Sequence, residues 1–276
     1  MKTKPIISVI LPTYNREIPL GELLQSLVLQ TFSSFEVIIV NDAGESVRSV
    51  IERYPELSIR YEELTENVGH VHARNRAVEY AQGEYILLMD DDDLLVPTHL
   101  ETMYEAIHDA DLVYSDAEIF HYEWNEWGRV VTNRTVFAYE YTLEGMRSFS
   151  SYIPSGSLYR RSLHEEIGLF DGAIHNYWDW DFFLRVADQH RIKRVPIAGV
   201  LYAWGGSGNQ SAQLNSKRGA YLQKLCEKHG LGQLPQKNFW DIRSEPEVQA
   251  RATTTTIVWD GVIIPARPNE TKNPNG

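Results

Sequence analysis

Four consecutive aspartates are the residues of this chain best suited to chemistry. Asp90, Asp91, Asp92 and Asp93 follow an apolar run at residues 85–88 that is typical of a buried strand. Adjacent carboxylates repel one another, and burying them without partners is costly. Hard divalent cations such as Mg²⁺ and Mn²⁺ prefer oxygen ligands and often bridge carboxylates to phosphates. The run therefore indicates either a metal site for a phosphorylated substrate or a solvated acidic loop.

The elements around the aspartates must decide between these two interpretations. Apolar runs at residues 6–11, 35–40, 59–61, 85–88 and 112–114 predict strands, and apolar residues at helical spacing between them predict helices. Strands and helices that alternate at short intervals predict an α/β fold. Its sheet would be Rossmann-like, doubly wound and mostly parallel, with helices on both faces. Ligands of such sheets bind outside the carboxyl ends of the strands.

Polar clusters follow three of the predicted strands. They are Thr13-Tyr14-Asn15, Asn41-Asp42 and the aspartate run. Because parallel strands bring their carboxyl ends to one edge, the three clusters should meet there. A solvated loop would not require this agreement, so the sequence favours a binding site. The first strand is followed by no Gly-rich fingerprint, which argues against a dinucleotide fold, and the chain has no P-loop motif.

Composition limits the class of protein. The 276 residues suffice for one large α/β domain or two small ones, and 43% hydrophobic content can supply a core. A net charge of -12 argues against nucleic acid as a general partner. The single cysteine, Cys226, excludes an intramolecular disulfide and a Cys-rich zinc site. No stretch approaches the roughly 18 apolar residues of a transmembrane segment. We expect a soluble, cytoplasmic protein, with peripheral membrane contact left open.

The later part of the chain gives weaker patterns. Residues 153–159 are strand-like, residues 253–259 could form an edge strand or a hairpin with residues 262–264, and residues 265–276 are expected to be disordered. Residues 205–209 are typical of a flexible loop. His70 and His72 form an H-x-H pair, but residues two apart on a helix do not face each other. We therefore expect both at the surface.

Six segments in order resemble the family 2 glycosyltransferases of the GT-A fold, over roughly residues 5–230. They are residues 8–16 (SVILPTYNR), 40–42 (VND), 67–69 (NVG) with 73–75 (ARN), 88–93 (LMDDDD), 168–171 (GLFD) and 179–181 (DWD). The resemblance implies a nucleotide-sugar donor, with UDP as the expected nucleotide. It also implies an inverting, metal-dependent transfer of a hexose to a hydroxyl of a carbohydrate or glycoconjugate acceptor, as in polysaccharide or glycoconjugate synthesis.

The same resemblance implies donor-binding roles. Pro12, Thr13 and Tyr14 would line the base and ribose, with Asn15 in the same segment, and Asp42 would accept a hydrogen bond from the base. Arg74 would lie near the base or the diphosphate. Asp90, Asp91 and Asp92 match the D-x-D motif of the family: Asp90 would face ribose and metal, and Asp92 would bind the metal directly. The implied cofactor is Mn²⁺ or Mg²⁺.

The general base is the second implied role. Asp179 matches the family's catalytic carboxylate, with Asp181 as the alternative. The family usually has Glu where this chain has Trp178, whose indole could stack on an acceptor ring. Asp181 is also a candidate on the acceptor side, or a residue that pins the helix. Many relatives carry a His in the segment that matches residues 202–207, as a third metal ligand, and this chain has none there.

The chain is therefore predicted to have a donor-binding half (residues 1–117), a half that binds the acceptor and carries the base (residues 118–232), and a partly disordered C-terminal extension (residues 233–276). Two other functions share some of these features. A nucleotidyltransferase that makes a sugar nucleotide would use a similar sheet and metal, but it favours a Gly-rich basic loop after the first strand. A non-catalytic nucleotide- or carbohydrate-binding protein would agree with Trp178 and the missing His.

Overall fold

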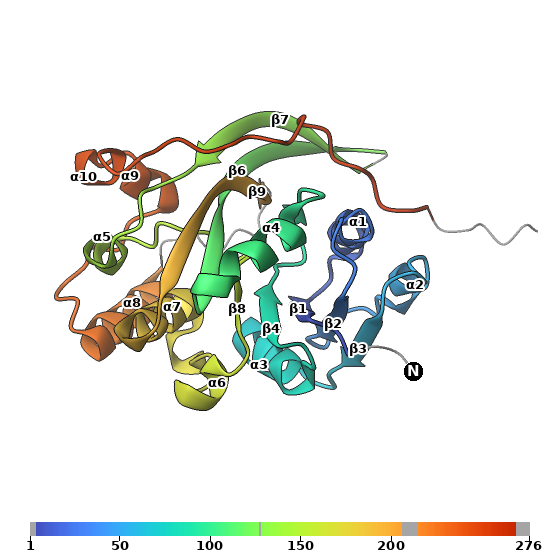
Figure 1. The fold of residues 1–276 in the computed structure, drawn as a ribbon, viewed down its shortest axis with the longest axis horizontal. Coiled ribbons are helices and arrows are strands. Elements are labelled where there is room, and N and C mark those ends of the chain that lie inside the picture. Colours follow the sequence, from blue (N-terminus) through green and yellow to red (C-terminus); the bar gives the residue numbers. More distant parts are fainter. Residues whose placement is uncertain (1–3, 127, 206–214, 269–276) are drawn as a thin grey trace, which may run out of the picture.

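The computed structural model describes residues 4–126, 128–205 and 215–268 (Figure 1). The strands are β1 (Ile7–Thr13), β2 (Phe35–Asn41), β3 (Ile59–Glu63), β4 (Tyr85–Leu88), β5 (Leu94–Leu95), β6 (Leu112–Asn125), β7 (Gly128–Phe137), β8 (Leu158–Arg160) and β9 (Ile192–Trp204). The helices are α1 (Glu17–Val28), α2 (Arg48–Ile51), α3 (His70–Tyr80), α4 (His99–Ala106), α5 (Leu143–Ser148), α6 (Leu163–Glu166), α7 (Trp178–Gln189), α8 (Ser216–His229), α9 (Phe239–Arg243) and α10 (Pro246–Gln249). Two short 3-10 helices, η1 (Ile107–Asp109) and η2 (Gly172–Tyr177), complete the described elements.

One mixed sheet runs through the described residues, in the order β3-β2-β1-β4-β8-β6-β9-β5, with β7 paired to β6. Strands β1 to β4 are parallel to their neighbours in this group, and β6 is parallel to β9. Thr13 pairs with Asn41, and Ile10 pairs with Leu88. The carboxyl ends of β1, β2 and β4 therefore meet at one edge, as the three polar clusters predicted.

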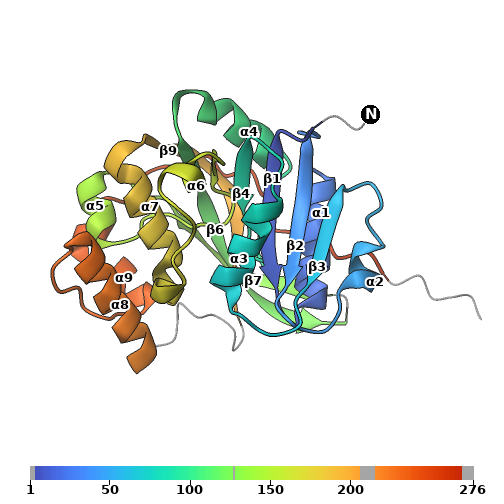
Figure 2. The same cartoon turned by 90° about the horizontal axis from the view of Figure 1, so that it is seen from below.

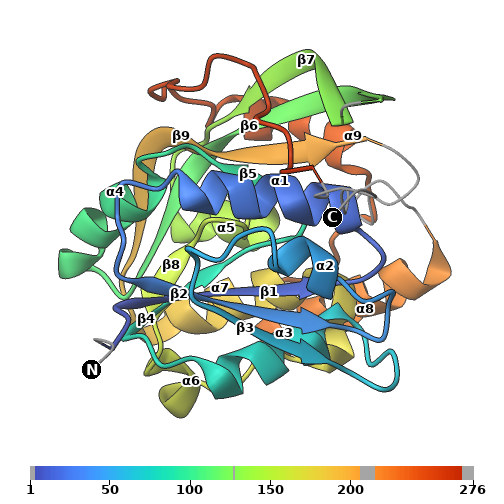
Figure 3. The same ribbon diagram turned by 90° about the vertical axis from the view of Figure 1, so that its right-hand side faces the viewer.

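Helices cover both faces of the sheet because successive side chains of a strand point to opposite faces. In β1, Val9 belongs to one core and Ile10 to the other. The first core also contains residues of α1, α2 and α4, and the second contains residues of α3, α6, α7 and α8. Figures 2 and 3 show α1 and α3 on opposite faces of β1 and β2. The predicted doubly wound architecture is confirmed.

The fifth predicted strand is much longer than expected. Residues 112–114 are only the start of β6, which continues to Asn125 and pairs antiparallel with β7. The first nine residues of β6 are buried, including Ser115, Asp116 and Glu118, so no in–out alternation is visible in the sequence. Asp116 is buried because Arg194 donates to both of its carboxylate oxygens, at 2.8 and 2.6 Å. When charged residues are buried in ion pairs, a strand shows no alternation of apolar and polar residues, so its full length cannot be predicted from the sequence.

Three predictions for the later chain are wrong in whole or in part. Residues 153–159 form a strand only from Leu158 onward. Residues 253–264 form no hairpin and contribute the single bridge of Thr256 to Ile197. Residues 265–268 are ordered, because the backbone N–H of Arg267 donates to the Tyr54 hydroxyl at 3.0 Å. The remaining residues of the predicted disordered segment, 269–276, and residues 206–209 of the predicted loop lie outside the described residues. Among those described, no helix is long and apolar enough to cross a membrane.

A buried ion pair joins α1 to β7. The Nε of Arg129 donates to Glu22 at 2.6 Å, and both side chains are 0% exposed. Glu22→Ala would leave the Arg129 guanidinium buried without its counter-charge, so we expect it to lower the free energy of unfolding by about 3–5 kcal/mol. Urea denaturation would measure this loss. Glu17→Ala is the control on the same helix: Glu17 is 53% exposed and should cost at most about 1 kcal/mol. Equal losses in the two variants would contradict the expectation.

Candidate active site

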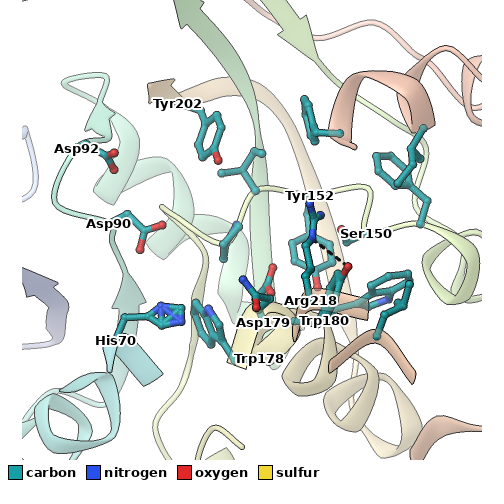
Figure 4. Close-up of a pocket in the computed structure, with 18 of the residues that line it drawn as sticks. His70, Asp90, Asp92, Ser150, Tyr152, Trp178, Asp179, Trp180, Tyr202 and Arg218 are labelled. Atoms are coloured by element: carbon teal, nitrogen blue, oxygen red, sulfur yellow. Dashed lines mark hydrogen bonds between the residues drawn. The ribbon is translucent and has the colours of Figure 1, made fainter. Parts of the chain in front are cut away.

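The predicted site residues converge on one pocket of about 580 Å³ at the carboxyl edge of the sheet. Its wall contains ten of them: Pro12, Thr13, Tyr14, Asp42, Arg74, Asp90, Asp91, Asp92, Trp178 and Asp179. Figure 4 shows the carboxylates of Asp90 and Asp92 on one side of this pocket and Asp179 on the other, at the start of α7. Residues from both predicted halves of the chain thus share a single cavity, which is the arrangement that a reaction between two substrates requires.

The four aspartates have different surroundings. The Thr13 hydroxyl donates to Asp91 at 2.7 Å, and Arg16 donates to its other oxygen at 3.2 Å. Asp93 accepts from the Ser155 hydroxyl and, at 2.9 Å, from the backbone N–H of Ala203. Burial raises the pKa of both carboxyls above the ordinary range. Asp91 and Asp93 therefore anchor the loop after β4, and Asp91, a predicted donor contact, also lines the pocket.

Asp90 and Asp92 present their carboxylates to the pocket (Figure 4). Arg74 forms an ion pair with Asp90, and Arg16 forms one with Asp92. The guanidinium groups balance charges that would otherwise repel each other at this edge. The side chain of Asp90 is 34% exposed and that of Asp92 is 19% exposed, so a ligand in the pocket can reach the carboxylate oxygens of both.

In the part of the chain that the structure describes, a cation at this edge of the pocket would meet two carboxylates, those of Asp90 and Asp92. Among the described residues, no group of three or more His, Cys, Asp or Glu side chains could hold a metal ion. Asp90 and Asp92 therefore supply at most two carboxylates. This donor set fits Mg²⁺ or Mn²⁺, which often bind through one or two carboxylates and complete their coordination with phosphate oxygens and water.

Asp42 fixes the loop that leads into α3. Its two carboxylate oxygens accept from the backbone N–H groups of Val68 at 2.8 Å and Gly69 at 2.9 Å. Gly69 has φ +88, a conformation that favours glycine. This pairing places His70, the first residue of α3, at the pocket wall. Each oxygen of Asp42 keeps a second lone pair that could accept a further hydrogen bond.

The prediction that His70 lies at the surface is wrong. His70 lines the pocket, and its ring centroid is 4.3 Å from that of His175. Burial, with help from the charge of Arg74, lowers the pKa of His70 to about 2, so the imidazole is neutral. Arg74 lies four residues later, on the same face of the helix. That spacing from a predicted site residue is the signal that could have identified His70. His72, by contrast, is exposed as expected.

Arg74 lies between the aspartates and the start of α7. Its side chain is buried, and its guanidinium carbon is 4.2 Å from the centre of the Trp178 ring. Burial lowers the pKa of Arg74 to about 10, which still leaves it protonated at neutral pH. Trp178 also packs against Phe170, with centroids 4.9 Å apart. One face of this indole is therefore taken by Arg74, so Trp178 orients the guanidinium in addition to lining the pocket.

Asp179 lies in the first turn of α7. Burial raises its pKa to about 6, while the backbone N–H groups of Trp180 and Asp179 and the charge of Arg74 oppose the rise. The neighbouring Trp180 is anchored, since its Nε1 donates to the Met146 carbonyl at 2.7 Å. Asp179 is thus a carboxylate on a rigid element, with a pKa close to neutral pH. Such groups are suited to proton transfer.

Two predicted site residues lie elsewhere. Asp181 does not line the pocket: it is completely buried and accepts from Arg185 at 2.9 Å and from His229 at 2.8 Å. It ties α7 to α8, so the structure assigns it neither the base nor the acceptor role. Asn15 also lies outside the pocket wall, with φ +55, and its Oδ1 accepts from the backbone N–H of Glu45 at 2.7 Å. It shapes the turn after β1.

The far wall of the pocket comes from residues that the sequence did not indicate. They include Tyr152, Tyr202 and Arg218, and, from the C-terminal extension, Leu234, Pro235, Lys237, Phe239, Ile242, Glu245 and Glu247. The extension is held there by aromatic packing: Phe239 stacks on Trp204, with centroids 5.2 Å apart, and on Phe137 at 5.5 Å. It is therefore an integral part of the site. No local signal marks these residues, because only the tertiary fold brings them to the pocket.

Known proteins identify the family to which this site belongs. The family model described as glycosyl transferase family 2 matches residues 8–168, more than half of the chain. The chain belongs to glycosyltransferase family 2. It is 52% identical over 262 residues to the uncharacterized glycosyltransferase YwdF of Bacillus subtilis, an alignment that covers 95% of this chain and 98% of the relative. This family 2 protein is thus a glycosyltransferase, and the resemblance found in the sequence is confirmed.

Solved structures agree with the predicted GT-A fold. The crystal structure of S. aureus TarS 1-349 in complex with UDP-GlcNAc matches with a TM-score of 0.63 at 23% identity, covering 89% of this chain and 72% of that one. The mannosyltransferase PcManGT from Pyrobaculum calidifontis, in complex with GDP-Man and Mn²⁺, matches with a TM-score of 0.59 at 19% identity, covering 85% and 67%. At these identities the likeness shows the fold.

Proposed function

We propose that this protein is an inverting, metal-dependent glycosyltransferase that moves a sugar from a UDP-sugar to a hydroxyl of a carbohydrate or glycoconjugate acceptor. The observation that carries the proposal is the position of Asp179. It faces the same pocket as Asp90 and Asp92, and its pKa is raised to about 6. A donor end rich in carboxylates and guanidinium groups and a carboxylate that can accept a proton are the two parts that an inverting transfer needs.

The proton path follows from this arrangement. The Asp179 carboxylate accepts the proton of the acceptor hydroxyl as its oxygen attacks the anomeric carbon of the donor sugar. The bond from that carbon to the diphosphate oxygen breaks on the opposite side, so the configuration inverts. The low-polarity surroundings that raise the pKa of Asp179 make its carboxylate a stronger base than a solvated aspartate. A single displacement of this kind needs no covalent intermediate on the protein.

The leaving diphosphate would lie beside Arg74 and the aspartates. Asp90 and Asp92 would hold the cation together with the phosphates, and Asp42 with residues 12–14 would contact the nucleotide. When bound, the cation supplies positive charge that stabilises the departing diphosphate. Arg74 stays protonated and adds a second cationic group at the same end. UDP is the proposed nucleotide because TarS, whose fold is similar, is solved with UDP-GlcNAc.

The division of the chain into substrate-binding parts is also a proposal. Residues 1–117 would bind the donor, and residues 118–232 would bind the acceptor and supply the base. The pocket wall adds residues 234–247 to the acceptor part. Its mixture of aromatic side chains with Lys237, Glu245 and Glu247 suits a saccharide, whose C–H faces pack on rings and whose hydroxyls bind charged groups. Synthesis of a polysaccharide or glycoconjugate is the proposed context.

The pH dependence of transfer follows from the pKa of Asp179. Only the ionised carboxylate can accept a proton, so acidification below a pKa of about 6 removes the active form. We expect kcat/KM to be nearly constant at pH 7 to 8 and to fall to about a tenth of that value at pH 5. Initial rates of UDP release measured from pH 4.5 to 8 would test this. A profile that stays flat down to pH 5 would exclude Asp179, with this pKa, as the base.

Donor turnover tests the proposal as a whole. The protein is incubated with UDP-GlcNAc, UDP-glucose or GDP-mannose, with Mn²⁺ or with EDTA, and release of the nucleoside diphosphate is measured. We expect release from a UDP-sugar that depends on Mn²⁺. Formation of a sugar nucleotide from a nucleoside triphosphate and a sugar phosphate would instead support a nucleotidyltransferase. Binding of UDP without turnover of any donor, even with carbohydrate acceptors added, would support a non-catalytic binding protein.

A further inference from the structure

The peptide carbonyl of Asp92 is held by a residue from a distant part of the chain. Asp91 and Asp93 are fixed through their own side chains, by Thr13 and Ser155 among others. The side chain of Asp92 faces the pocket and pairs with Arg16. Its carbonyl accepts a hydrogen bond of 2.7 Å from Nη1 of Arg129, and the N–H of the same peptide, that of Asp93, donates to the Asp90 carbonyl at 3.3 Å. Of these two bonds, the one from Arg129 is the shorter and ties the Asp92 peptide to a distant part of the chain.

Arg129 is itself fixed from several directions. Its Nε donates to Glu22 of α1 at 2.6 Å, and neither side chain is exposed. Its guanidinium carbon is 5.2 Å from the ring centre of Phe120 and 5.1 Å from that of Tyr122. The preceding Gly128 has φ +135, and a Cβ atom there would be 2.9 Å from the Glu22 carboxylate. The hairpin of β6 and β7 thus approaches α1 too closely for another residue at position 128.

Stability alone does not account for this arrangement. A buried ion pair can often be replaced by apolar side chains without loss of stability, because both charges must be removed from water. What an apolar pair could not do is donate a hydrogen bond to the Asp92 carbonyl. Lysine could not satisfy both partners either, since its single ammonium lacks the fork that lets Arg129 reach Glu22 and Asp92 together.

We propose that Arg129, held by Glu22, is a positioning residue that sets the backbone of Asp92 and so presents its carboxylate to the cation and diphosphate of the donor. The inference rests on the proposed function only for the identity of that ligand. The hydrogen bond and the ion pair exist in the protein without it. Arg129 would act through Asp92 and would touch neither substrate.

The first test compares Arg129→Lys with Arg134→Lys by calorimetric titration of UDP with and without Mn²⁺. Arg134 lies on the same strand, donates to the Trp259 carbonyl at 3.1 Å and is 37% exposed. We expect Arg129→Lys to reduce the affinity gain that Mn²⁺ gives to UDP by at least about tenfold, the size of effect seen when a group supporting a metal ligand is lost. UDP binding without metal should stay within about twofold of the wild type, as should both values in Arg134→Lys. The proposal would be overturned if Arg129→Lys folds and Mn²⁺ increases its affinity for UDP as much as it does in the wild type.

A second readout needs no ligand. Hydrogen exchange is followed by mass spectrometry in the metal-free proteins, for a peptide covering residues 89–95 and for one covering β2. We expect exchange at residues 89–95 to be at least about tenfold faster in Arg129→Lys and unchanged in Arg134→Lys, with β2 unaffected in both. Equal exchange in all three proteins would overturn the proposal. If Arg129→Lys does not fold, the double variant Glu22→Leu with Arg129→Met removes both buried charges and also the donor to the Asp92 carbonyl. Hydrogen exchange at residues 89–95 is then measured in the double variant, with the same expected increase.

The two readouts separate this inference from the proposed function. If Mn²⁺ does not strengthen UDP binding to the wild-type protein, the proposed metal-dependent donor site is wrong. Exchange at residues 89–95 then still decides whether Arg129 positions Asp92.

Discussion

Asp179→Asn should lower the turnover number for sugar transfer by about 10²–10⁴-fold, the range for loss of a general base. The amide has nearly the shape of the carboxylate, but it cannot accept the acceptor proton. UDP should bind with close to its wild-type affinity, because Asp90 and Asp92 lie on the other side of the pocket and Arg74, which lies nearer to Asp179, keeps its ion pair with Asp90. Initial rates of UDP release and calorimetric titration of UDP would measure the two effects.

Asp188→Asn is the matched control for this substitution. Asp188 lies on the same helix, α7, and is exposed to solvent. Its turnover should remain within about twofold of the wild type, as expected for a surface substitution. An Asp179→Asn protein that binds UDP and transfers sugar at the wild-type rate would show that another group is the base. The burial and ion pairs of Asp181 make it a poor replacement, so the search would then turn to an acceptor-side residue such as Glu245.

Asp92→Asn should remove most of the contribution of Mn²⁺ to UDP binding. Loss of a supporting group around a metal typically costs 10–100-fold in affinity, so loss of a direct ligand should weaken Mn²⁺-dependent binding by about 100-fold or more. The protein should still fold, because Arg16 would keep its ion pair with Asp91. Calorimetry with and without Mn²⁺ would separate the metal-dependent part of binding from contacts to the nucleotide.

Asp109→Asn is the control for Asp92→Asn. Asp109 is half-exposed and pairs with Lys193 at 2.8 Å, away from the pocket wall. UDP affinity in the presence of Mn²⁺ should not change in this variant. If Asp92→Asn instead binds UDP as tightly as the wild type when Mn²⁺ is present, Asp92 is not a metal ligand. Asp90 with the phosphates would then have to hold the cation.

The donor end of the site could be predicted from the sequence because its residues follow strands directly. The carboxyl end of an apolar strand can be recognised in the sequence where the apolar run stops. In a parallel sheet, a polar residue at that end lies at the ligand-binding edge. This places Thr13, Asp42 and Asp90 together, although they lie far apart in the chain. Within the aspartate run, the side chains of Asp90 and Asp92 are more exposed than that of Asp91, which also lines the pocket but accepts a hydrogen bond from Thr13.

The acceptor end could not be predicted in the same way. Its residues come from segments without periodicity and from an extension that reaches the pocket only through the packing of Phe239 on Trp204. The H-x-H pair taken alone predicts a surface position for His70, and only its spacing from Arg74 on α3 indicates the pocket. No sequence pattern reveals that His229 lies 2.8 Å from Asp181, so the sequence leaves Asp181 as a candidate on the acceptor side. The contact of Arg129 with Asp92 was likewise not visible in the sequence.

The central claim is that Asp179 directs a single inverting displacement on a UDP-sugar held at the aspartates. Proton NMR of the sugar released from UDP-GlcNAc by the wild-type protein with Mn²⁺, recorded before mutarotation, tests it most directly. Water then takes the place of the acceptor, and the donor sugar is α-linked. The account predicts that the β anomer of the free sugar appears first, and that Asp179→Asn releases almost none. Release of the α anomer first would contradict the account.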